Sequence, residues 1–235
     1  MNFSSFSRFF SRKPRLAEDA AQRLADWKKL PEHCGQALLD SSRFVVVDVE
    51  TSGLNLARDR LIAIGAIAVK EGRIALGDSF EIVLQQQNAS AKDNILIHGI
   101  TGTAQTEGVA PVEALLRFLE FLGKDPLIAF HVTFDRTMIR RALKEFLGLN
   151  FKHHWADLAY IAPALYPGLK NRYRSLDDWI GHFDIQNFSR HSALADSLAT
   201  AQLFQVLAHQ AREKDILQFK GLQQLENAQR WVSWV

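Results

Sequence analysis

The sequence predicts an α/β fold in which a mixed β-sheet is flanked by helices. An unbroken apolar run, Phe44–Val49, is typical of a strand that is covered on both faces. Two more strand-like runs follow after short connections, Leu61–Val69 and Ile74–Leu84, which indicates an antiparallel three-strand meander. The remaining chain combines helical patterns with a short apolar run, Leu127–Phe130, so parallel strands are expected to extend the sheet.

The first 40 residues form a predicted leader. Within it, Leu16–Leu30 has helical spacing, and Pro31 is a plausible stop. The segment Met1–Arg15 mixes aromatic and basic residues without a continuous apolar stretch, which argues against a secretory signal. One interpretation of this segment is a basic amphipathic arm that touches a membrane surface or nucleic acid. We favour the other interpretation, a flexible or packed leader.

The later helices are predicted from apolar spacing and from residues that begin helices. Pro111 stands near the first position of a helix that continues to Leu122. Further helices are expected over residues 134–147, 157–165, 175–182, 192–211 and 215–235. We therefore divide the chain into a basic and helical leader (1–40), a central domain (42–208) and a C-terminal helical extension (209–235).

Composition narrows the function classes. The chain has 235 residues and is 47% hydrophobic, which allows a sizeable core, and its net charge of +2 does not by itself indicate a nucleic-acid binder. The single cysteine, Cys34, excludes an intrachain disulfide framework and a cysteine-rich zinc site. It fits a reducing compartment, so we expect a cytoplasmic protein. No apolar run has transmembrane length, and no membrane span is expected.

Two carboxylates stand at the end of the first predicted strand. Asp48 and Glu50 are two residues apart, so on an extended strand their side chains point to the same side. Burial of ionised carboxylates is costly without cations, and hard oxygen ligands are those that Mg²⁺ and Mn²⁺ prefer. Taken alone, the pair fits an exposed acidic turn equally well.

Three more polar residues lie where they could join this pair. Asp135 falls between a short strand and a helix start, where an acid is also common simply as a helix N-terminal residue. His191 and Asp196 lie at the start of the long late helix, where each alone reads as an ordinary solvent-facing or terminal residue. Together, four carboxylates and one histidine indicate two-metal phosphoryl chemistry, with a neutral imidazole able to accept a proton from water.

These residues carry a family resemblance. The chain contains Val47-Asp48-Val49-Glu50-Thr51-Ser52-Gly53-Leu54, then Phe134-Asp135, then His191-x₄-Asp196. The order and spacing resemble the three motifs of the DEDDh group of 3′–5′ exonucleases, which has a ribonuclease H-like fold. The nearest likeness is to the bacterial DNA polymerase III epsilon-subunit (proofreading) family, and it covers roughly residues 42–208, the expected exonuclease domain.

The resemblance implies a role for each matching residue. Asp48, Glu50, Asp135 and Asp196 would hold two divalent ions, Mg²⁺ or Mn²⁺, and His191 would be the general base. Four further residues would contact the terminal nucleotide: Thr51 and Ser52 after the first strand, Thr51 largely through its backbone, and Ile97 and His98 from a segment similar to the family's H-G-I-T. Taken alone, Ile97 reads as ordinary core and His98 as a turn residue beside Gly99.

Some features depart from the family pattern or fall outside it. Many relatives carry His-Asn where this chain has Phe130-His131, which bears on substrate preference but leaves Asp135 in place. The basic loop Lys170–Arg174, which contains an aromatic residue, is the best candidate for contacts with phosphates. No polymerase-binding segment is recognisable in the tail, which favours a stand-alone exonuclease; polymerase association and oligomeric state are left open.

The sequence thus predicts a metal-dependent 3′–5′ exonuclease that releases nucleoside 5′-monophosphates from a single-stranded or frayed DNA 3′ end, in proofreading or repair. An RNA-directed exonuclease of the same superfamily, of the oligoribonuclease or tRNA-trimming type, would use the same residues. An inactive module that only binds nucleic acid or a polymerase is a third reading, although all five expected side chains are present. A metal phosphohydrolase without a polymeric substrate is a fourth.

Overall fold

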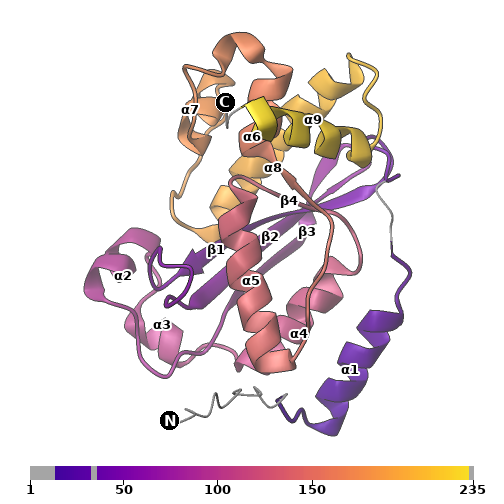
Figure 1. Cartoon of the computed structure of the whole chain (residues 1–235). Helices are drawn as coiled ribbons and strands as arrows, with labels where there is room; N and C mark the ends of the chain where they lie inside the picture. Colours follow the sequence, from indigo (N-terminus) through magenta and orange to yellow (C-terminus); the bar gives the residue numbers. More distant parts are fainter. Residues whose placement is uncertain (1–13, 33–35, 233–235) are drawn as a thin grey trace, which may run out of the picture.

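A five-stranded mixed sheet forms the centre of the molecule in a computed structural model that describes residues 14–32 and 36–232 (Figure 1). The strand order is β3-β2-β1-β4-β5; β1, β2 and β3 pair antiparallel, and β4 and β5 continue the sheet in parallel with β1. The strands are β1 (Arg43–Thr51), β2 (Leu61–Lys70), β3 (Arg73–Val83), β4 (Leu127–Ala129) and β5 (Trp155–Asp157). The predicted meander and the parallel extension are both confirmed.

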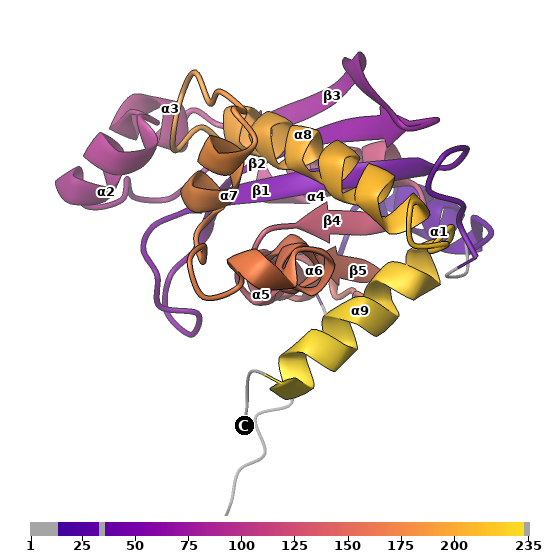
Figure 2. The same ribbon diagram turned by 90° about the horizontal axis from the view of Figure 1, so that it is seen from above.

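Helices cover both faces of this sheet (Figure 2). One face packs against α1 (Glu18–Lys29), α4 (Pro111–Leu122) and α5 (Val132–Leu147). The other packs against α6 (Leu158–Leu165), α7 (Leu176–His182), α8 (Ala193–Arg212) and α9 (Phe219–Val232). Because both faces are buried, the apolar run of β1 is continuous rather than alternating.

Four short elements were not predicted, and one of them is the 3₁₀ helix η1 (Pro167–Leu169). Helices α2 (Lys92–His98) and α3 (Gly102–Thr106) project beyond the sheet edge near the end of β1, and they are too short to show an amphipathic period (Figure 1). Asp157, the last residue of β5, falls in the helix expected over residues 157–165, whereas the helix α6 begins one residue later. A three-residue strand carries no periodic signal, so only its pairing with β4 identifies it.

The predicted leader contributes a helix that packs on the domain. Ala20, Leu24 and Trp27 of α1 are buried against α4, and the Trp27 indole N–H donates to the Gly123 carbonyl at 2.8 Å. The Arg23 guanidinium pairs with Glu113 and Glu120 of α4 at 2.5 and 2.7 Å. The interpretation of residues 1–15 as a basic arm falls almost wholly outside the described residues, as does Cys34.

The C-terminal extension also belongs to the packed structure. The Phe219 ring of α9 is fully buried against Phe44 of β1, with ring centroids 5.9 Å apart. Just before α9, Gln218 forms an isolated antiparallel bridge with Leu38 at the end of the leader. Among the described residues, no helix has the length and apolar character needed to cross a bilayer. The proposed division at residues 40–42 and 208–209 stays a prediction.

Candidate active site

The alternation of side chains along β1 directs Asp48 and Glu50 toward α8. Val45, Val47 and Val49 pack with α4 and α5, whereas Phe44 and Val46 pack with α8. Asp48 and Glu50 continue the second series, so they extend from the α8 face at the end of the strand. The same alternation that lets β1 contribute side chains to both cores therefore places two carboxylates on one face at the end of the strand.

A glycine allows α8 to approach the sheet at this point. Gly65 of β2 is the direct partner of Asp48 in the antiparallel pair. A Cβ at Gly65 would lie 2.2 Å from the Ala193 carbonyl carbon, and the Ser197 hydroxyl donates to the Gly65 carbonyl at 2.9 Å. The first turn of α8 thus rests directly on the backbone of β2, which brings Asp196 next to Asp48.

Three carboxylates meet as a result. Asp48, Glu50 and Asp196 each offer an oxygen, and these oxygens all lie within 4.8 Å of one another. Asp135, in the first turn of α5, is outside this group of three but close enough for its charge to raise the pKa of Asp48. Four acidic residues from β1, α5 and α8 therefore gather at one end of the sheet.

The electrostatics of this carboxylate cluster favour added positive charge. Burial, together with the charges of Asp135, Asp196 and Glu50, raises the pKa of Asp48 well above its usual value. Burial, and then the charge of Asp196, raises the pKa of Glu50 to about 8. Burial is also the main cause that raises the pKa of Asp135. Ionised carboxylates at this density need cations to offset their repulsion.

Arg190 supplies one such cation from the protein itself. Its guanidinium donates to the Asp196 carboxylate at 2.6 Å and also pairs with Asp177 of α7 at 2.9 Å. The Asn187 amide and the His191 backbone N–H complete the hydrogen bonds to Asp196, whose residue is only 4% exposed. The segment before α8 is therefore tied to the carboxylate cluster.

The residues fit divalent metal ions. The donors are carboxylate oxygens, which Mg²⁺ and Mn²⁺ prefer over sulfur or imidazole ligands, and their spacing lets several of them reach one ion. Arg190 shows that one of these carboxylates, that of Asp196, already accepts a positive partner. Asp48, Glu50 and Asp196 are the residues that would hold an ion directly, with Asp135 in support.

This electrostatic arrangement makes metal-free stability depend on pH through Glu50. The ordinary pKa of 4.5 rises to about 8 in the fold, so between these values the folded protein holds a proton that the unfolded chain releases. The stabilising contribution is complete below the lower value and is lost as the pH rises through the upper one. In a chelating buffer, we expect the thermal midpoint of unfolding to fall as the pH is raised from about 5 to about 8.

The Glu50→Gln variant separates this contribution from those of other groups. Its midpoint should fall less over the same range, while the exposed Glu107→Gln control should follow the wild type. An unchanged pH slope in Glu50→Gln would contradict the assignment.

The remaining predicted residues after β1 and at α8 are placed as follows. His191 is exposed and lies two residues before Ala193, the first residue of α8, in a left-handed backbone conformation (φ 61°). The Thr51 hydroxyl donates to the Gly53 carbonyl at 2.7 Å, and the Ser52 hydroxyl donates to Asp59 at 2.9 Å. Both hydroxyls are engaged within the loop, and the Ser52 backbone N–H donates to the Arg60 carbonyl at 3.0 Å.

The two predicted residues of α2, Ile97 and His98, differ in their exposure. Ile97 is 55% exposed and available for contact. His98 is 6% exposed; its Nδ1 accepts from the Ile100 N–H at 3.0 Å, and its Nε2 lies 3.4 Å from the Ser90 hydroxyl. The His98 imidazole therefore stabilises the turn, and its contact with a terminal nucleotide stays a prediction. The Asn94 amide donates to the Ser52 carbonyl, which ties α2 to the loop after β1.

A further buried carboxylate, that of Asp157, holds the start of α5 in place. Asp157, at the end of β5, accepts from the backbone N–H of His131 at 3.0 Å and of Ala159 at 3.1 Å. Its other oxygen accepts from Arg230 of α9 at 2.8 Å, and the Arg230 guanidinium also covers the Tyr160 ring at 3.8 Å. Since His131 caps α5, this network fixes the helix start that carries Asp135.

Replacing Arg230 with alanine should destabilise the fold. The Asp157 side chain is 2% exposed, and its buried carboxylate would lose the Arg230 cation. Loss of one partner of a buried pair costs about 3–5 kcal/mol, and because Arg230 is partly exposed we expect about 2 kcal/mol here. For a chain of this length that lowers the thermal midpoint by roughly 6 °C.

Two further variants identify the cause. The exposed Lys220→Ala on the same helix should leave the midpoint unchanged. Adding Asp157→Asn to Arg230→Ala should recover part of the loss, because it removes the unpaired charge. Equal midpoints for Arg230→Ala and Lys220→Ala would refute the proposed support.

Comparison with known proteins agrees with this geometry. A family profile described as exonuclease (RNase_T) matches residues 45–204, which include every residue of the carboxylate cluster. The chain belongs to the exonuclease family. Its motif order and its fold place it in the DEDDh-type 3′–5′ exonuclease group, so the resemblance seen in the sequence is confirmed.

The relatives of this exonuclease-family chain include large polymerases. It is 35% identical over 182 residues to the PolC-type DNA polymerase III of Halalkalibacterium halodurans, and 30% identical over 197 residues to that of Bacillus subtilis. These alignments cover 77% and 83% of this chain but only 12% and 13% of the polymerases. The chain thus spans only a small part of the length of each of these relatives.

Solved structures share the exonuclease fold. E. coli Exonuclease I in complex with a dT13 oligonucleotide matches with a TM-score of 0.63 at 19% identity, covering 74% of this chain and 42% of that one. Exonuclease X in complex with 5′ overhanging duplex DNA matches with a TM-score of 0.57 at 18% identity, covering 71% and 91%. The predicted mixed sheet with flanking helices is therefore confirmed.

Sequence reasoning missed several residues of this exonuclease site. Gly65, Arg190 and Arg230 were not singled out, and Asp157 was noted only as part of a helix-like segment. Arg190 lies next to His191 in the chain, which was the one available signal. Arg230 lies 73 residues from Asp157, and no local pattern links the two.

Proposed function

We propose that this protein removes nucleoside 5′-monophosphates from the 3′ end of a DNA strand by metal-dependent hydrolysis. The observation that carries the proposal is the convergence of Asp48, Glu50 and Asp196 within 4.8 Å, with Asp135 close enough for its charge to act on Asp48. When bound, divalent ions would supply charge stabilisation for the attacking and leaving oxygens of an in-line displacement.

The chain's own residues would perform the other tasks. Asp48, Glu50 and Asp196 would hold the ions, and Asp135 would assist. His191, exposed at the start of α8, would accept a proton from the attacking water. Ile97 would pack against the terminal base, and the backbone at Thr51 and Ser52 would lie by the terminal sugar.

DNA is the favoured substrate because the similar proteins named above are DNA polymerases and a nuclease bound to a DNA oligonucleotide. A frayed or single-stranded end is expected, since the terminal base must reach the carboxylate cluster. RNA is the second candidate, because the catalytic carboxylates and histidine do not distinguish the two sugars. Association with a polymerase remains a proposal that the relatives' names suggest.

A time course on strands labelled at either end tests the proposal. With Mg²⁺ or Mn²⁺, a 3′-labelled DNA strand should release labelled mononucleotide first, while a 5′-labelled strand shortens stepwise. Parallel RNA strands measure the preference. Absence of mononucleotide release with both ions would refute the proposal, and cleavage at internal bonds would refute the exonuclease assignment.

Replacing His191 with alanine should lower the rate by about 10²–10⁴-fold, the usual contribution of a general base. Metal binding should persist, because the carboxylates remain in place. Isothermal calorimetry with Mn²⁺ measures binding apart from turnover. The surface variant His209→Ala should retain the wild-type rate. Loss of Mn²⁺ binding in His191→Ala would show that the residue acts on the metal site and not as a base.

A further inference from the structure

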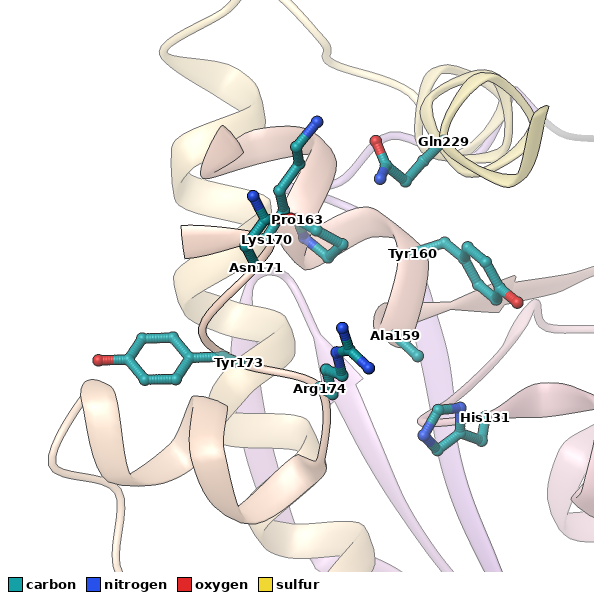
Figure 3. Close-up of a pocket in the computed structure, with 9 residues that line it drawn as sticks. All are labelled: His131, Ala159, Tyr160, Pro163, Lys170, Asn171, Tyr173, Arg174 and Gln229. Atoms are coloured by element: carbon teal, nitrogen blue, oxygen red, sulfur yellow. The ribbon is translucent and has the colours of Figure 1, made fainter. Parts of the chain in front are cut away.

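A basic hollow lies at the start of α5, the helix that carries Asp135. It has a volume of about 550 Å³ and is bounded by α6, the loop before α7, the start of α5 and α9 (Figure 3). The Lys170 and Arg174 side chains extend along it from the loop, Gln229 faces it from α9, and His131 lies at its edge. These polar side chains come from segments up to 98 residues apart in the chain.

The charge of the hollow has one sign. Its lining contains Lys170, Arg174 and His131 together with the amides of Asn171 and Gln229, and no carboxylate of the described residues lines it. Arg23, Arg43, Arg190 and Arg230 elsewhere all pair with carboxylates. By contrast, among the residues that the structure describes, neither Lys170 nor Arg174 has an ion-pair partner.

The loop that carries these cations is held in place. The backbone N–H groups of Arg174 and Ser175 donate to the Asp178 carboxylate at 2.9 and 2.8 Å, and Ser175 forms a capping box at the start of α7. The Tyr173 ring packs edge-on against Trp179 at 5.6 Å. Binding at the hollow would therefore not require the backbone of this loop to become ordered.

Two segments that line the hollow also connect to the carboxylate cluster along the chain. His131 caps α5, and Asp135 lies in the first turn of that helix. Arg174 stands three residues before Asp177, which pairs with Arg190 and through it with Asp196. A nucleic-acid strand whose 3′ end reached the carboxylates could place the preceding part of its backbone in the hollow.

We propose that this hollow binds a backbone phosphate of the substrate strand, on the 5′ side of the bond that is cut. The proposal rests on the exonuclease function proposed above. Phosphate fits better than a base, because the two tyrosine rings beside the hollow are already engaged. Arg230 covers Tyr160, and Tyr173 packs on Trp179. Phosphate contacts position a strand without reading its sequence.

The double variant Lys170→Met/Arg174→Met tests the proposal on substrates of two lengths. On a ten-nucleotide dT strand, kcat/KM should fall about tenfold, mainly through KM, as charge-assisted contacts are lost. On a dinucleotide, which has no further phosphate to reach the hollow, kcat/KM should not change. Arg172→Met is the matched control in the same loop, because Arg172 lies over the Tyr173 ring and does not line the hollow.

Equilibrium binding tests the hollow without turnover. Anisotropy of a labelled ten-nucleotide dT strand in chelator should show weaker binding for the double variant. The slope of log affinity against log salt should become less steep by about 0.7 for each lost phosphate contact. If the hollow instead held free mononucleotide, the double variant would change inhibition by thymidine 5′-monophosphate and leave the length dependence intact, which would overturn the proposal.

The exonuclease function and the phosphate site can be refuted separately. If the wild type released no mononucleotide from any strand, the proposed function would fail, while the anisotropy would still report on the hollow. If the double variant matched Arg172→Met in length dependence and salt slope, the phosphate site would be wrong, whatever the fate of the exonuclease assignment.

Discussion

The Asp48→Ala variant should lose at least about 10³-fold in mononucleotide release, because Asp48 is central to the charge stabilisation that the site provides. Its carboxylate interacts with those of Asp135, Asp196 and Glu50, so its loss removes the member that links the cluster. The measurement is the rate of label release from a 3′-labelled DNA strand under saturating Mg²⁺.

The fold should survive this change. Burial and neighbouring charges make the Asp48 carboxylate unfavourable in the metal-free protein, so Asp48→Asn, which keeps the volume, should unfold in chelator at the wild-type temperature or above it. Asp40→Asn, an exposed carboxamide change at the other end of β1, is the control for both measurements. Wild-type turnover by Asp48→Ala would remove the basis of the catalytic assignment.

Gly65→Ala should inactivate the protein without touching any catalytic side chain. The new Cβ would lie 2.2 to 2.5 Å from the backbone of Ala193 and Leu194, so the start of α8 must move away from β2. Displacement of catalytic groups by about 1 Å can cost 10²-fold in rate. We expect about that loss in turnover, together with a destabilisation of about 1–3 kcal/mol from overpacking.

A neighbouring glycine provides the matched control. Gly77 lies on the adjacent strand β3, and a Cβ there would meet nothing within 4 Å. Gly77→Ala should keep the wild-type rate and stability. Mn²⁺ titration by calorimetry adds a second reading, because moving Asp196 away from Asp48 should weaken binding in Gly65→Ala alone. If both alanine variants behaved alike, α8 would not depend on this close approach.

Much of the fold could be predicted because its signals are local. The apolar run of β1, the two following strands and the long helix α8 each carry a pattern within one element. The predicted ends of α8 agree with the structure to within a residue. β5 has three residues and α2 and α3 have seven and five, so they are too short for a period to appear, and contacts with distant segments determine them.

The same distinction applies to the site. The strand period alone places Asp48 and Glu50 on one face, and the helix start alone places Asp196 near His191. The contacts of His98 with Ser90 and with the turn after α2 have no local signal, and its contact with a nucleotide stays a prediction. The basic loop was visible in the sequence, but only the structure separates Lys170 and Arg174 from Arg172.

The sequence by itself determined the chemistry that this protein can offer: four carboxylates and a histidine, in an order and spacing that its family shares. The tertiary structure decided how those groups are held. Gly65 sets the distance between α8 and the sheet, Arg190 balances the charge of Asp196, and Arg230 secures Asp157 beneath α5. The reason is physical: residue type and local period are properties of a short segment, whereas close approach and charge pairing depend on residues that only folding brings together.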